Sequence, residues 1–234
     1  MRLLLISNST NAGEEYLEYP MENIRNFLGS SGLKALFVPY AGVTVSFDDY
    51  ENRVKERFND TGHDIVSIHH FDDPAEAVEE AEAIVVGGGN TFRLAELLHK
   101  NGLVEKIRNR ILKGIPYIGW SAGANAACPT ICTTNDMPIV QPPGFDAFNL
   151  VKFQINPHYL DSNPDGHAGE TREMRITEYI ELNRNTYVVG LREGSMLLLE
   201  NGSIRLIGTR TMRIFKYGVS PVELGGDDDA GFLI

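Results

Sequence analysis

Residues 117–130 of this chain of 234 residues read YIGWSAGANAACPT, and this stretch decides the fold. The apolar run IPYI (115–118) predicts a buried strand, and AGANAA (122–127) predicts a helix that Pro129 ends. Between them, one serine lies between two glycines, where the chain must turn sharply. A strand, a tight turn and a helix in this order begin a strand–helix–strand unit, which indicates a parallel sheet.

Four similar apolar runs precede this stretch, and helical patterns separate them. None of the runs alternates strictly between apolar and polar residues, which is typical of parallel strands covered on both faces. The first helical pattern, MENIRNFLG, places Ile24, Phe27 and Leu28 on one side and stops at Gly29. The strand-like runs are LLLIS (3–7), ALFVP (35–39), DIVSIHH (64–70) and AIVVGG (83–88). The other helical patterns are DDYENRVKERF (48–58), FRLAELLHKNG (92–102) and LVEKIRNRIL (103–112).

The pattern changes after residue 185, where strand-like runs follow one another with tight turns. Asn201-Gly202 is a strong signal for a hairpin, so this part is expected to add antiparallel strands. The sequence therefore predicts a single α/β domain over residues 1–234, with a mostly parallel, doubly wound sheet, helices on both faces and antiparallel C-terminal strands. The Gly- and Asp-rich segment 225–234 is predicted to be a loose tail.

Charge and composition exclude several classes of function. The net charge of −11 argues against nucleic acids and anionic membrane surfaces as partners. No apolar stretch reaches the roughly 18 residues of a membrane span, and MRLLLISNST (1–10) is interpreted as a buried strand rather than a secretion signal. Cys128 and Cys132 form a lone C-x3-C pair, which is a poor zinc site, and we interpret them as reduced thiols of a cytoplasmic protein.

The serine between the glycines is the first candidate catalytic residue. Gly119, Ser121 and Gly123 form the pattern G-x-S-x-G between a strand and a helix, where a nucleophilic serine is held on a strained turn. The backbone N–H of Ala122, at the start of the helix, is expected to face the same space and to stabilise an oxyanion. The alternative is a tight turn with an incidental serine, and the strand–turn–helix setting favours the nucleophile.

VVGGGNTF (85–92) is a second place where a strand ends in glycines and a helix begins. Three successive glycines allow the backbone to approach a ligand closely and offer N–H groups to it. The pattern is neither G-x-G-x-x-G nor a phosphate-binding loop, because Asn90 and Thr91 follow directly and no G-K-[ST] is present. We therefore expect Gly89 to supply the second donor of an oxyanion hole.

A nucleophilic serine needs a base, and the base needs an acid that orients it. His158 follows a short strand, FQINP, that is expected to end at the same sheet edge as the serine, and His167 is the weaker candidate. Glu193, after the strand TYVVGL, and Asp136, in the polar loop TTNDMP, can each be the acid, and spacing alone does not choose between them. The histidines interpreted as surface or structural residues are His69, His70 and His99.

Taken together, these motifs resemble those of the peptidase E family, the α-aspartyl dipeptidases. The similarity extends from residue 1 to about residue 200 and is far more specific than G-x-S-x-G alone. The family has a fold similar to that of class I glutamine amidotransferases, with serine in place of the usual cysteine. The matching stretches are LLLISNST, PYAGVT, VVGGGNTF, YIGWSAGAN, CPTICTTNDMPIV, GFDAFNL, QINPHY, GHAGETRE and VVGLREGS.

The resemblance implies hydrolysis of dipeptides with an N-terminal aspartate, written Asp-X, without a metal ion or another cofactor. Residue by residue, it implies Ser121 as the nucleophile and His158 as the base. Both Glu193 and Asp136 fall on matching motifs, and we expect Glu193 to be the third member because it ends a strand near the sheet edge. The expected partner is an acidic dipeptide in the cytoplasm, and the sequence is compatible with a homodimer.

Because the chain has a net charge of −11, it must supply a local positive charge to bind an acidic substrate. Read as a helix, GETREMRITEYIEL places Arg172 on the same apolar stripe as Ile176 and Ile180. Its guanidinium can bind the substrate carboxylate through two parallel hydrogen bonds, or it can pair with a protein acid such as Glu170 or Glu193. The substrate amine needs an acceptor, and the candidates are Asn90, Asn135 and Asp136.

Two other functions remain compatible with the sequence. A cyanophycinase-like peptidase cleaves β-linked aspartyl-arginine with the same nucleophile, but it needs acidic pockets for its substrate. A non-catalytic small-molecule-binding protein of the same fold is disfavoured by the intact nucleophile, base, acid and glycine loop. A glutamine amidotransferase is disfavoured because the turn carries serine where that chemistry uses a thiolate.

Overall fold

The computed structural model of the chain describes residues 1–30, 32–163, 166 and 168–234. Strands and helices alternate along its first half, as the sequence predicts, and no helix within the described residues is long and apolar enough to cross a membrane. The strands of this half are β1 (Arg2–Ile6), β2 (Lys34–Val38), β3 (Asp64–Ser67), β4 (Ala83–Val86) and β5 (Pro116–Trp120). The helices are α1 (Met21–Leu28), α2 (Phe47–Phe58), α3 (Pro74–Glu80), α4 (Thr91–Lys100), α5 (Val104–Leu112) and α6 (Ala122–Ala126), with short 3-10 helices η1 (Asn59–Thr61) and η2 (Ile68–His70).

These five strands form the parallel part of a seven-stranded sheet, in the order β3-β2-β4-β5-β1-β8-β9. β8 (Met196–Glu200) and β9 (Ser203–Ile207) extend the sheet beside β1 as an antiparallel hairpin. The turn between them contains Asn201 and Gly202 with φ values of 53° and 74°. Positive φ at both central residues is the signature of the expected two-residue turn, so the predicted hairpin is confirmed.

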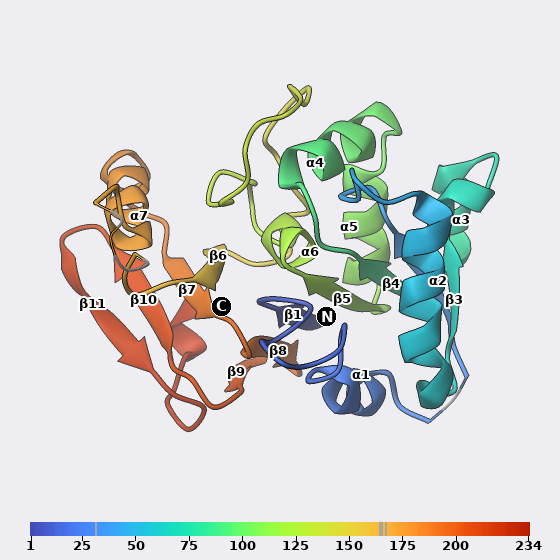
Figure 1. The fold of residues 1–234 in the computed structure, drawn as a ribbon, viewed down its shortest axis with the longest axis horizontal. Coiled ribbons are helices and arrows are strands. Elements are labelled where there is room, and N and C mark those ends of the chain that lie inside the picture. The colour runs from blue at the N-terminus through green and yellow to red at the C-terminus, as the bar shows by residue number, and fades with distance from the viewer. Residues whose placement is uncertain (31, 164–165, 167) are drawn as a thin grey trace.

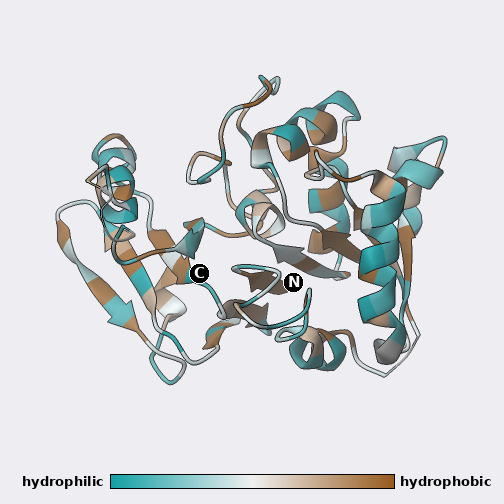
Figure 2. Cartoon of the chain, in the orientation of Figure 1, coloured by the Kyte–Doolittle hydropathy of each residue, from teal (hydrophilic) through white to brown (hydrophobic). Residues whose placement is uncertain are grey.

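Helices cover both faces of the large sheet, which confirms the doubly wound arrangement (Figure 1). α1 and α2 pack on one face through residues such as Ile24 and Val54, and α3 to α6 pack on the other through residues such as Leu94 and Ile107. Figure 2 shows hydrophobic residues concentrated in the strands of this sheet. Because each central strand is buried on both sides, its sequence is continuously apolar rather than alternating.

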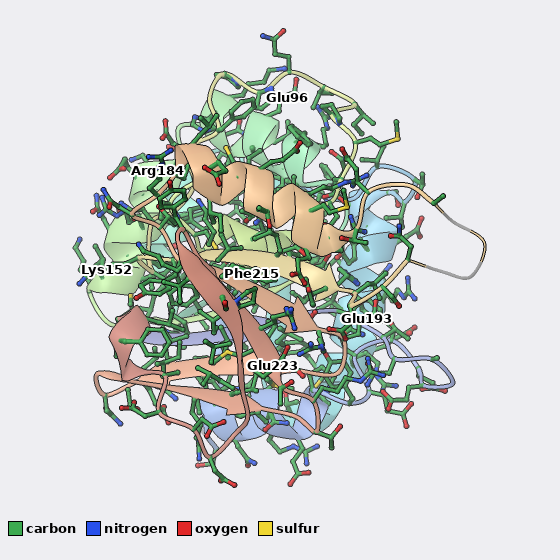
Figure 3. The ribbon with its side chains drawn as sticks, turned by 90° about the vertical axis from the view of Figure 1, so that its left-hand side faces the viewer. Glu96, Lys152, Arg184, Glu193, Phe215 and Glu223 are labelled. Atoms are coloured by element: carbon green, nitrogen blue, oxygen red, sulfur yellow. The ribbon has the colours of Figure 1, made fainter. Side chains whose placement is uncertain are left out.

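A separate four-stranded sheet, in the order β11-β10-β7-β6, lies beside the large one (Figure 1). The sequence does not predict this division, nor β11, whose residues are largely exposed and include Pro221. α7 (Arg172–Leu182) packs on this sheet, where Ile176 and Ile180 contact the cluster that contains Phe215 (Figure 3). β6 and β7 pair in parallel, and the other neighbours pair antiparallel. The strands are β6 (Gln154–Tyr159), β7 (Val188–Arg192), β10 (Met212–Lys216) and β11 (Val219–Leu224).

The C-terminal segment is ordered, so the prediction of a loose tail over 225–234 is wrong. It ends in a short 3-10 helix, η3 (Gly231–Leu233), that contacts β9. Ala230 and Leu233 are buried in the core of the large sheet although the segment is rich in glycine and aspartate. Asp228 accepts a hydrogen bond from a backbone N–H at the start of the segment. The acidic residues therefore contribute to the turns that bring the last apolar side chains into the core.

A buried arginine forms hydrogen bonds with several segments of the small sheet. The side chain of Arg192, at the end of β7, is 9% exposed and donates hydrogen bonds to Asp161, to Glu223 of β11 and to Thr211. The hydrogen bonds from Arg192 lower the pKa of Glu223 from 4.5 to about 2, and they also lower the pKa of Asp161. The cation is stable in this buried position because two carboxylates accept its hydrogen bonds.

Glu223→Gln should lower the free energy of unfolding at neutral pH and change its dependence on pH. The folded state keeps this carboxyl ionised down to about pH 2, whereas the unfolded chain protonates it near pH 4.5. The stability that Glu223 contributes is therefore present above pH 4.5 and is lost as the pH falls toward 2.

Urea unfolding of the two proteins across this pH range measures the effect, and the difference in free energy should shrink as the pH falls. Glu178→Gln, at an exposed position of α7, is the matched control and should change little at any pH. A difference between Glu223→Gln and the wild type that stays constant with pH would contradict the assignment.

Candidate active site

The serine at the end of β5 has a backbone conformation that few residues adopt. Ser121 has φ 53° and ψ −111°, and a residue in such a sparsely populated region typically stores about 1–3 kcal/mol of strain. The two glycines of the motif make this turn sterically feasible. A Cβ at Gly119 would lie 2.4 Å from the carbonyl oxygen of Gly123, and a Cβ at Gly123 would lie 2.2 Å from that of Val86. The pattern G-x-S-x-G is therefore required by the close approach of β4, β5 and α6.

Three side chains form a continuous series of hydrogen bonds. Ser121 Oγ lies 2.9 Å from His158 Nε2, and His158 Nδ1 lies 2.7 Å from Glu193 Oε1. When Nδ1 carries the proton and donates to the carboxylate, Nε2 is left as the acceptor for the serine hydroxyl. The structure thus brings together the serine, the histidine and one of the two acids expected from the sequence.

The serine and the histidine come from different sheets, which corrects the expectation that they share one sheet edge. Ser121 follows β5 of the large sheet, whereas His158 lies in β6 and Glu193 follows β7, both in the small sheet. The strand before the histidine does not end at Pro157, since β6 continues to Tyr159. His158 has φ 51° and lies at a register shift between β6 and β7. Irregularities of this kind change the direction in which a side chain points, and they are common beside active sites.

Two residues that the sequence analysis did not single out hold this arrangement. Ser7, directly after β1, accepts a hydrogen bond from the backbone N–H of His158 at 3.0 Å and donates to the carbonyl oxygen of Leu191 at 2.8 Å. Asn8 accepts a hydrogen bond from the N–H of Gly194, in the turn after β7, at 2.9 Å. One feature of the sequence could have indicated these two residues, because Ser7 and Asn8 form a polar pair directly after the buried strand LLLI. This strand lies beside β5, so its carboxyl end is close to Ser121.

The glycine loop after β4 lies against the serine. A Cβ at Gly88 would lie 3.0 Å from Ser121 Cβ. The next residue, Gly89, has φ 131°, and a Cβ there would lie 2.2 Å from the carbonyl oxygen of Ala41. Neither of these two glycines donates its N–H to a residue that the structure describes. Ala122 is the first residue of α6, so its N–H also has no acceptor within the helix.

Asp136 is not bonded to the histidine, because Glu193 occupies that position. Its Oδ2 accepts hydrogen bonds from the N–H and the hydroxyl of Thr91, at 2.7 and 2.5 Å, and from the hydroxyl of Thr134 at 3.1 Å. These bonds hold the loop after α6 against the N-terminus of α4. Oδ1 accepts no hydrogen bond from any described residue, and Asp136 lines the same cavity as the serine.

Beside the serine is a cavity of 390 Å³, a volume in the range of small-ligand sites. Arg172 lines it from α7, and Asn135 lines it from the loop after α6. The amide of Asn135 donates to the carbonyl oxygen of Pro157 and accepts from Asn156. Asn90 is not among the described lining residues, since its side chain caps the N-terminus of α4. A larger cavity, of 470 Å³, lies beside β2 and β3, with no serine, cysteine or histidine among its described lining residues.

Arg172 is the only lysine or arginine among the described residues that line the cavity of the serine. It is half-buried on the apolar side of α7, as the helical pattern predicts. Burial lowers the pKa of its guanidinium, Arg175 lowers it further, and Asp136 raises it. Neither expected protein acid pairs with it, because Glu170 lies 3.6 Å from Arg175 and Glu193 is bonded to the histidine. Within the described ranges, its charge is therefore not neutralised by an ion pair.

Comparison with known proteins assigns the chain to a family. A family model of peptidase family S51 matches residues 3–207. The chain belongs to peptidase family S51. Peptidase E of Nostoc sp. is 52% identical to this S51 peptidase over 233 residues, which cover 100% of this chain and 96% of the relative. Peptidase E of Salmonella typhimurium is 47% identical over 224 residues, which cover 96% of this chain and 97% of the relative. The resemblance to the peptidase E family is thereby confirmed, and the chain is a peptidase.

A solved structure supports the fold of this S51 peptidase. The crystal structure of a peptidase from an acI-B1 actinobacterium has a TM-score of 0.70 at 18% sequence identity, covering 97% of this chain and 95% of that chain. At this identity the likeness concerns the fold alone. The predicted α/β class, with a mostly parallel sheet and helices on both of its faces, is confirmed.

None of the other described histidines of the S51 peptidase lines the cavity of the serine. His63 and His99 each contact a backbone carbonyl oxygen, at 3.0 and 2.9 Å. His69 and His70 lie together in η2 and contact carboxylates of α2. His167, the weaker candidate for the base, lies outside the described residues.

Proposed function

We propose that this S51 peptidase is a serine dipeptidase that hydrolyses dipeptides with an N-terminal aspartate. The observation that carries the proposal is the hydrogen-bonded series Ser121–His158–Glu193 beside the cavity. Ser121 is the proposed nucleophile, His158 the base and Glu193 the acid that orients the base. The two free cysteines are compatible with action in the reducing cytoplasm.

In the proposed reaction, His158 Nε2 takes the hydroxyl proton while Ser121 Oγ bonds to the scissile carbonyl carbon. The carbonyl oxygen becomes an oxyanion, and Glu193 stabilises the imidazolium that forms. His158 then gives the proton to the leaving amine as the C–N bond breaks, which leaves an acyl-enzyme. The same histidine deprotonates a water molecule that hydrolyses the ester and restores the serine hydroxyl.

The oxyanion requires hydrogen-bond donors that are fixed before the reaction begins. Ala122 is one proposed donor, because its N–H lies at a helix N-terminus, which favours negative charge. The glycine loop supplies the second, either from Gly89, as the sequence predicts, or from Gly88, which lies against Ser121. Loss of one such donor typically costs about 2.7–4 kcal/mol of transition-state stabilisation.

The charges beside the cavity suit a substrate that carries both an ammonium group and a side-chain carboxylate. Arg172, which forms no ion pair with any described residue, is the proposed partner of the carboxylate. Asp136, whose Oδ1 accepts no hydrogen bond within the described part of the chain, is the proposed partner of the ammonium. Asn135 is less suitable because its amide is already bonded at both ends. A cation in the cavity also disfavours the arginyl side chain that a cyanophycinase-like peptidase must bind.

Ser121→Ala should abolish hydrolysis of Asp-Leu and leave the fold unchanged, because the hydroxyl is the nucleophile but contributes little to packing. Release of leucine measures the activity, and far-UV circular dichroism measures the fold. Ser203→Ala, at an exposed position of β9, makes the same change outside the cavity and should retain full activity. If Ser121→Ala keeps activity within about tenfold of the wild type, about 1.4 kcal/mol of barrier, another residue is the nucleophile.

Glu193→Gln should lower kcat for Asp-Leu by about 10⁴-fold, because His158 loses its counter-charge and its fixed tautomer. Asp136→Asn should act mainly on KM, because this residue is proposed to bind the substrate amine. Steady-state kinetics of both variants separate the two roles. A larger loss of kcat in Asp136→Asn than in Glu193→Gln would reverse the assignment.

Arg172→Met should lower kcat/KM for Asp-Leu by about tenfold to a few hundredfold, since a charge-assisted hydrogen-bonded pair is worth about 1.5–3 kcal/mol. Methionine keeps an apolar side chain at this half-buried position of α7 but removes the charge. The kcat/KM for Asn-Leu should change little or rise. Arg175→Met is the matched control, because Arg175 is exposed and pairs with Glu170, and it should leave the ratio of the two substrates unchanged.

An unchanged ratio of Asp-Leu to Asn-Leu in Arg172→Met would exclude Arg172 from substrate recognition. A lower unfolding temperature with an equal loss on both substrates would instead indicate a structural ion pair. The preference of the wild type for Asp-Leu should also weaken as the pH falls through the pKa of the substrate carboxyl, about 4 when free.

A further inference from the structure

A second group of polar side chains lies where the N-terminal part of α2 meets η2, on the opposite side of the molecule from β6 and β7 (Figure 1). We call it the α2–η2 cluster, and it consists of Asp48, Glu51, His69 and His70. One carboxylate oxygen or imidazole nitrogen from each residue lies within 4.8 Å of those from the others. None of the four is among the described residues that line the cavity beside Ser121.

Glu51 is the buried member of the cluster, with a side chain that is 3% exposed. Its Oε1 accepts hydrogen bonds from the N–H of Ser67 at 2.7 Å and from Lys55 Nζ at 2.9 Å, and its Oε2 lies 2.6 Å from His70 Nε2. Burial raises the pKa of this carboxyl, but the hydrogen bonds from His70, Lys55 and Ser67 outweigh burial and lower the pKa overall. The carboxylate is thus held ionised, with one oxygen turned toward the histidines.

The two imidazoles present the same atom, Nε2, to the carboxylates. His69 Nε2 lies 2.9 Å from Asp48 Oδ1, and His70 Nε2 lies 3.9 Å from the same oxygen. On the other side of its ring, His69 Nδ1 lies 2.6 Å from Ser67 Oγ. A proton on Nδ1 can be donated to this hydroxyl, which leaves Nε2 without a proton, as a metal ligand requires.

We propose that the α2–η2 cluster binds one Zn²⁺ ion through Nε2 of His69 and His70, one oxygen of Asp48 and Oε2 of Glu51. Imidazoles and carboxylates are ligands that Zn²⁺ takes in tetrahedral sites, at about 2.0–2.2 Å. Tetrahedral ligands at these distances are about 3.3 Å apart. Three of the separations in the cluster, 2.6, 2.9 and 3.9 Å, bracket this value, and all of them lie within 4.8 Å, so side-chain movements can bring the four atoms to it. Binding displaces any proton that Nε2 of either histidine carries, and this proton passes to water.

Two neighbouring positive charges oppose a cation at this position. One is the N-terminal end of the α2 dipole, and the other is Lys55. Lys55 is bonded to Oε1 of Glu51, which the ion does not use, and its side chain is 42% exposed, so the ammonium can turn into water. The carboxylates of Asp48 and Glu51 balance the double charge of Zn²⁺, which leaves the occupied site without net charge.

The ion joins α2 to η2, and α2 also contacts the glycine loop. Tyr50, on α2 between the two acids of the cluster, donates its hydroxyl to the carbonyl oxygen of Gly88 at 2.9 Å. Zn²⁺ at the cluster therefore fixes the helix that supports this loop without contacting the reacting atoms. The site is structural, so it is compatible with hydrolysis that uses no metal, and it does not rest on the proposed function.

The test is Zn²⁺ binding by the full chain after treatment with a chelator, followed by isothermal titration calorimetry with ZnCl₂. One ion should bind per chain in the wild type and also in His158→Ala, which removes the histidine beside Ser121. The double variant His69→Asn, His70→Asn should bind Zn²⁺ at least about 100-fold more weakly, because two of the four ligands are lost. Zn²⁺ should raise the unfolding temperature of the proteins that bind it and leave that of the double variant unchanged.

Asp48→Asn and Asp49→Asn form a matched pair, because both remove one negative charge from the exposed first turn of α2 and only Asp48 belongs to the cluster. Asp48→Asn should weaken Zn²⁺ binding at least about tenfold, and Asp49→Asn should not. Equal affinities in this pair, or no binding by the wild type tighter than about 1 mM, would overturn the proposal. Peptide hydrolysis is not measured, so the result is independent of the role of Ser121.

Discussion

The hydroxyl of Ser7 joins the two sheets at the point on which the geometry of the cavity depends. Ser7 follows β1, an interior strand of the large sheet, and its Oγ is bonded to the backbone of His158 in β6 and of Leu191 in β7. One residue earlier, the carbonyl oxygen of Ile6 accepts the N–H of Ser121 at 3.0 Å. The end of β1 therefore positions both the serine and the histidine. Loss of the buried Ser7 hydroxyl would leave the N–H of His158 and the carbonyl oxygen of Leu191 without this partner. An unsatisfied buried group typically costs about 1–3 kcal/mol of folding free energy.

The large sheet could be predicted from the sequence because strands buried on both faces have a local signature, a short continuous apolar run. In the small sheet, β6 and β7 were expected as strands, but β11 lacks such a signature. β11 is largely exposed and contains Pro221, so nothing in its composition marks it as a strand. The division into two sheets depends on pairings between distant segments, such as β6 with β7. The burial of Leu233 is likewise a long-range contact, and local composition wrongly predicted a loose end.

The residues beside the cavity also divide into those with a local sequence signature and those whose place depends on long-range contacts. Ser121 is recognisable because its flanking glycines are required by contacts that are close in sequence. The choice between Glu193 and Asp136 is not local, because it depends on β6 and β7 lying side by side. Asn90 was expected to bind substrate, but a residue at a strand end can also precede a helix, and Asn90 caps α4 instead.

The separation of Ser121 and His158 between two sheets also matters while the chain is being made. The strained turn precedes β6 and β7 in the chain, and nascent chains tend to fold from their N-terminal end. A partly synthesised chain can therefore contain the serine in its turn before β6 and β7 exist. In the proposed mechanism such a chain cannot activate its serine hydroxyl, because His158, the base, is not yet made. Hydrolytic competence then arises only when β6 and β7 dock beside the large sheet, late in the synthesis and folding of the chain.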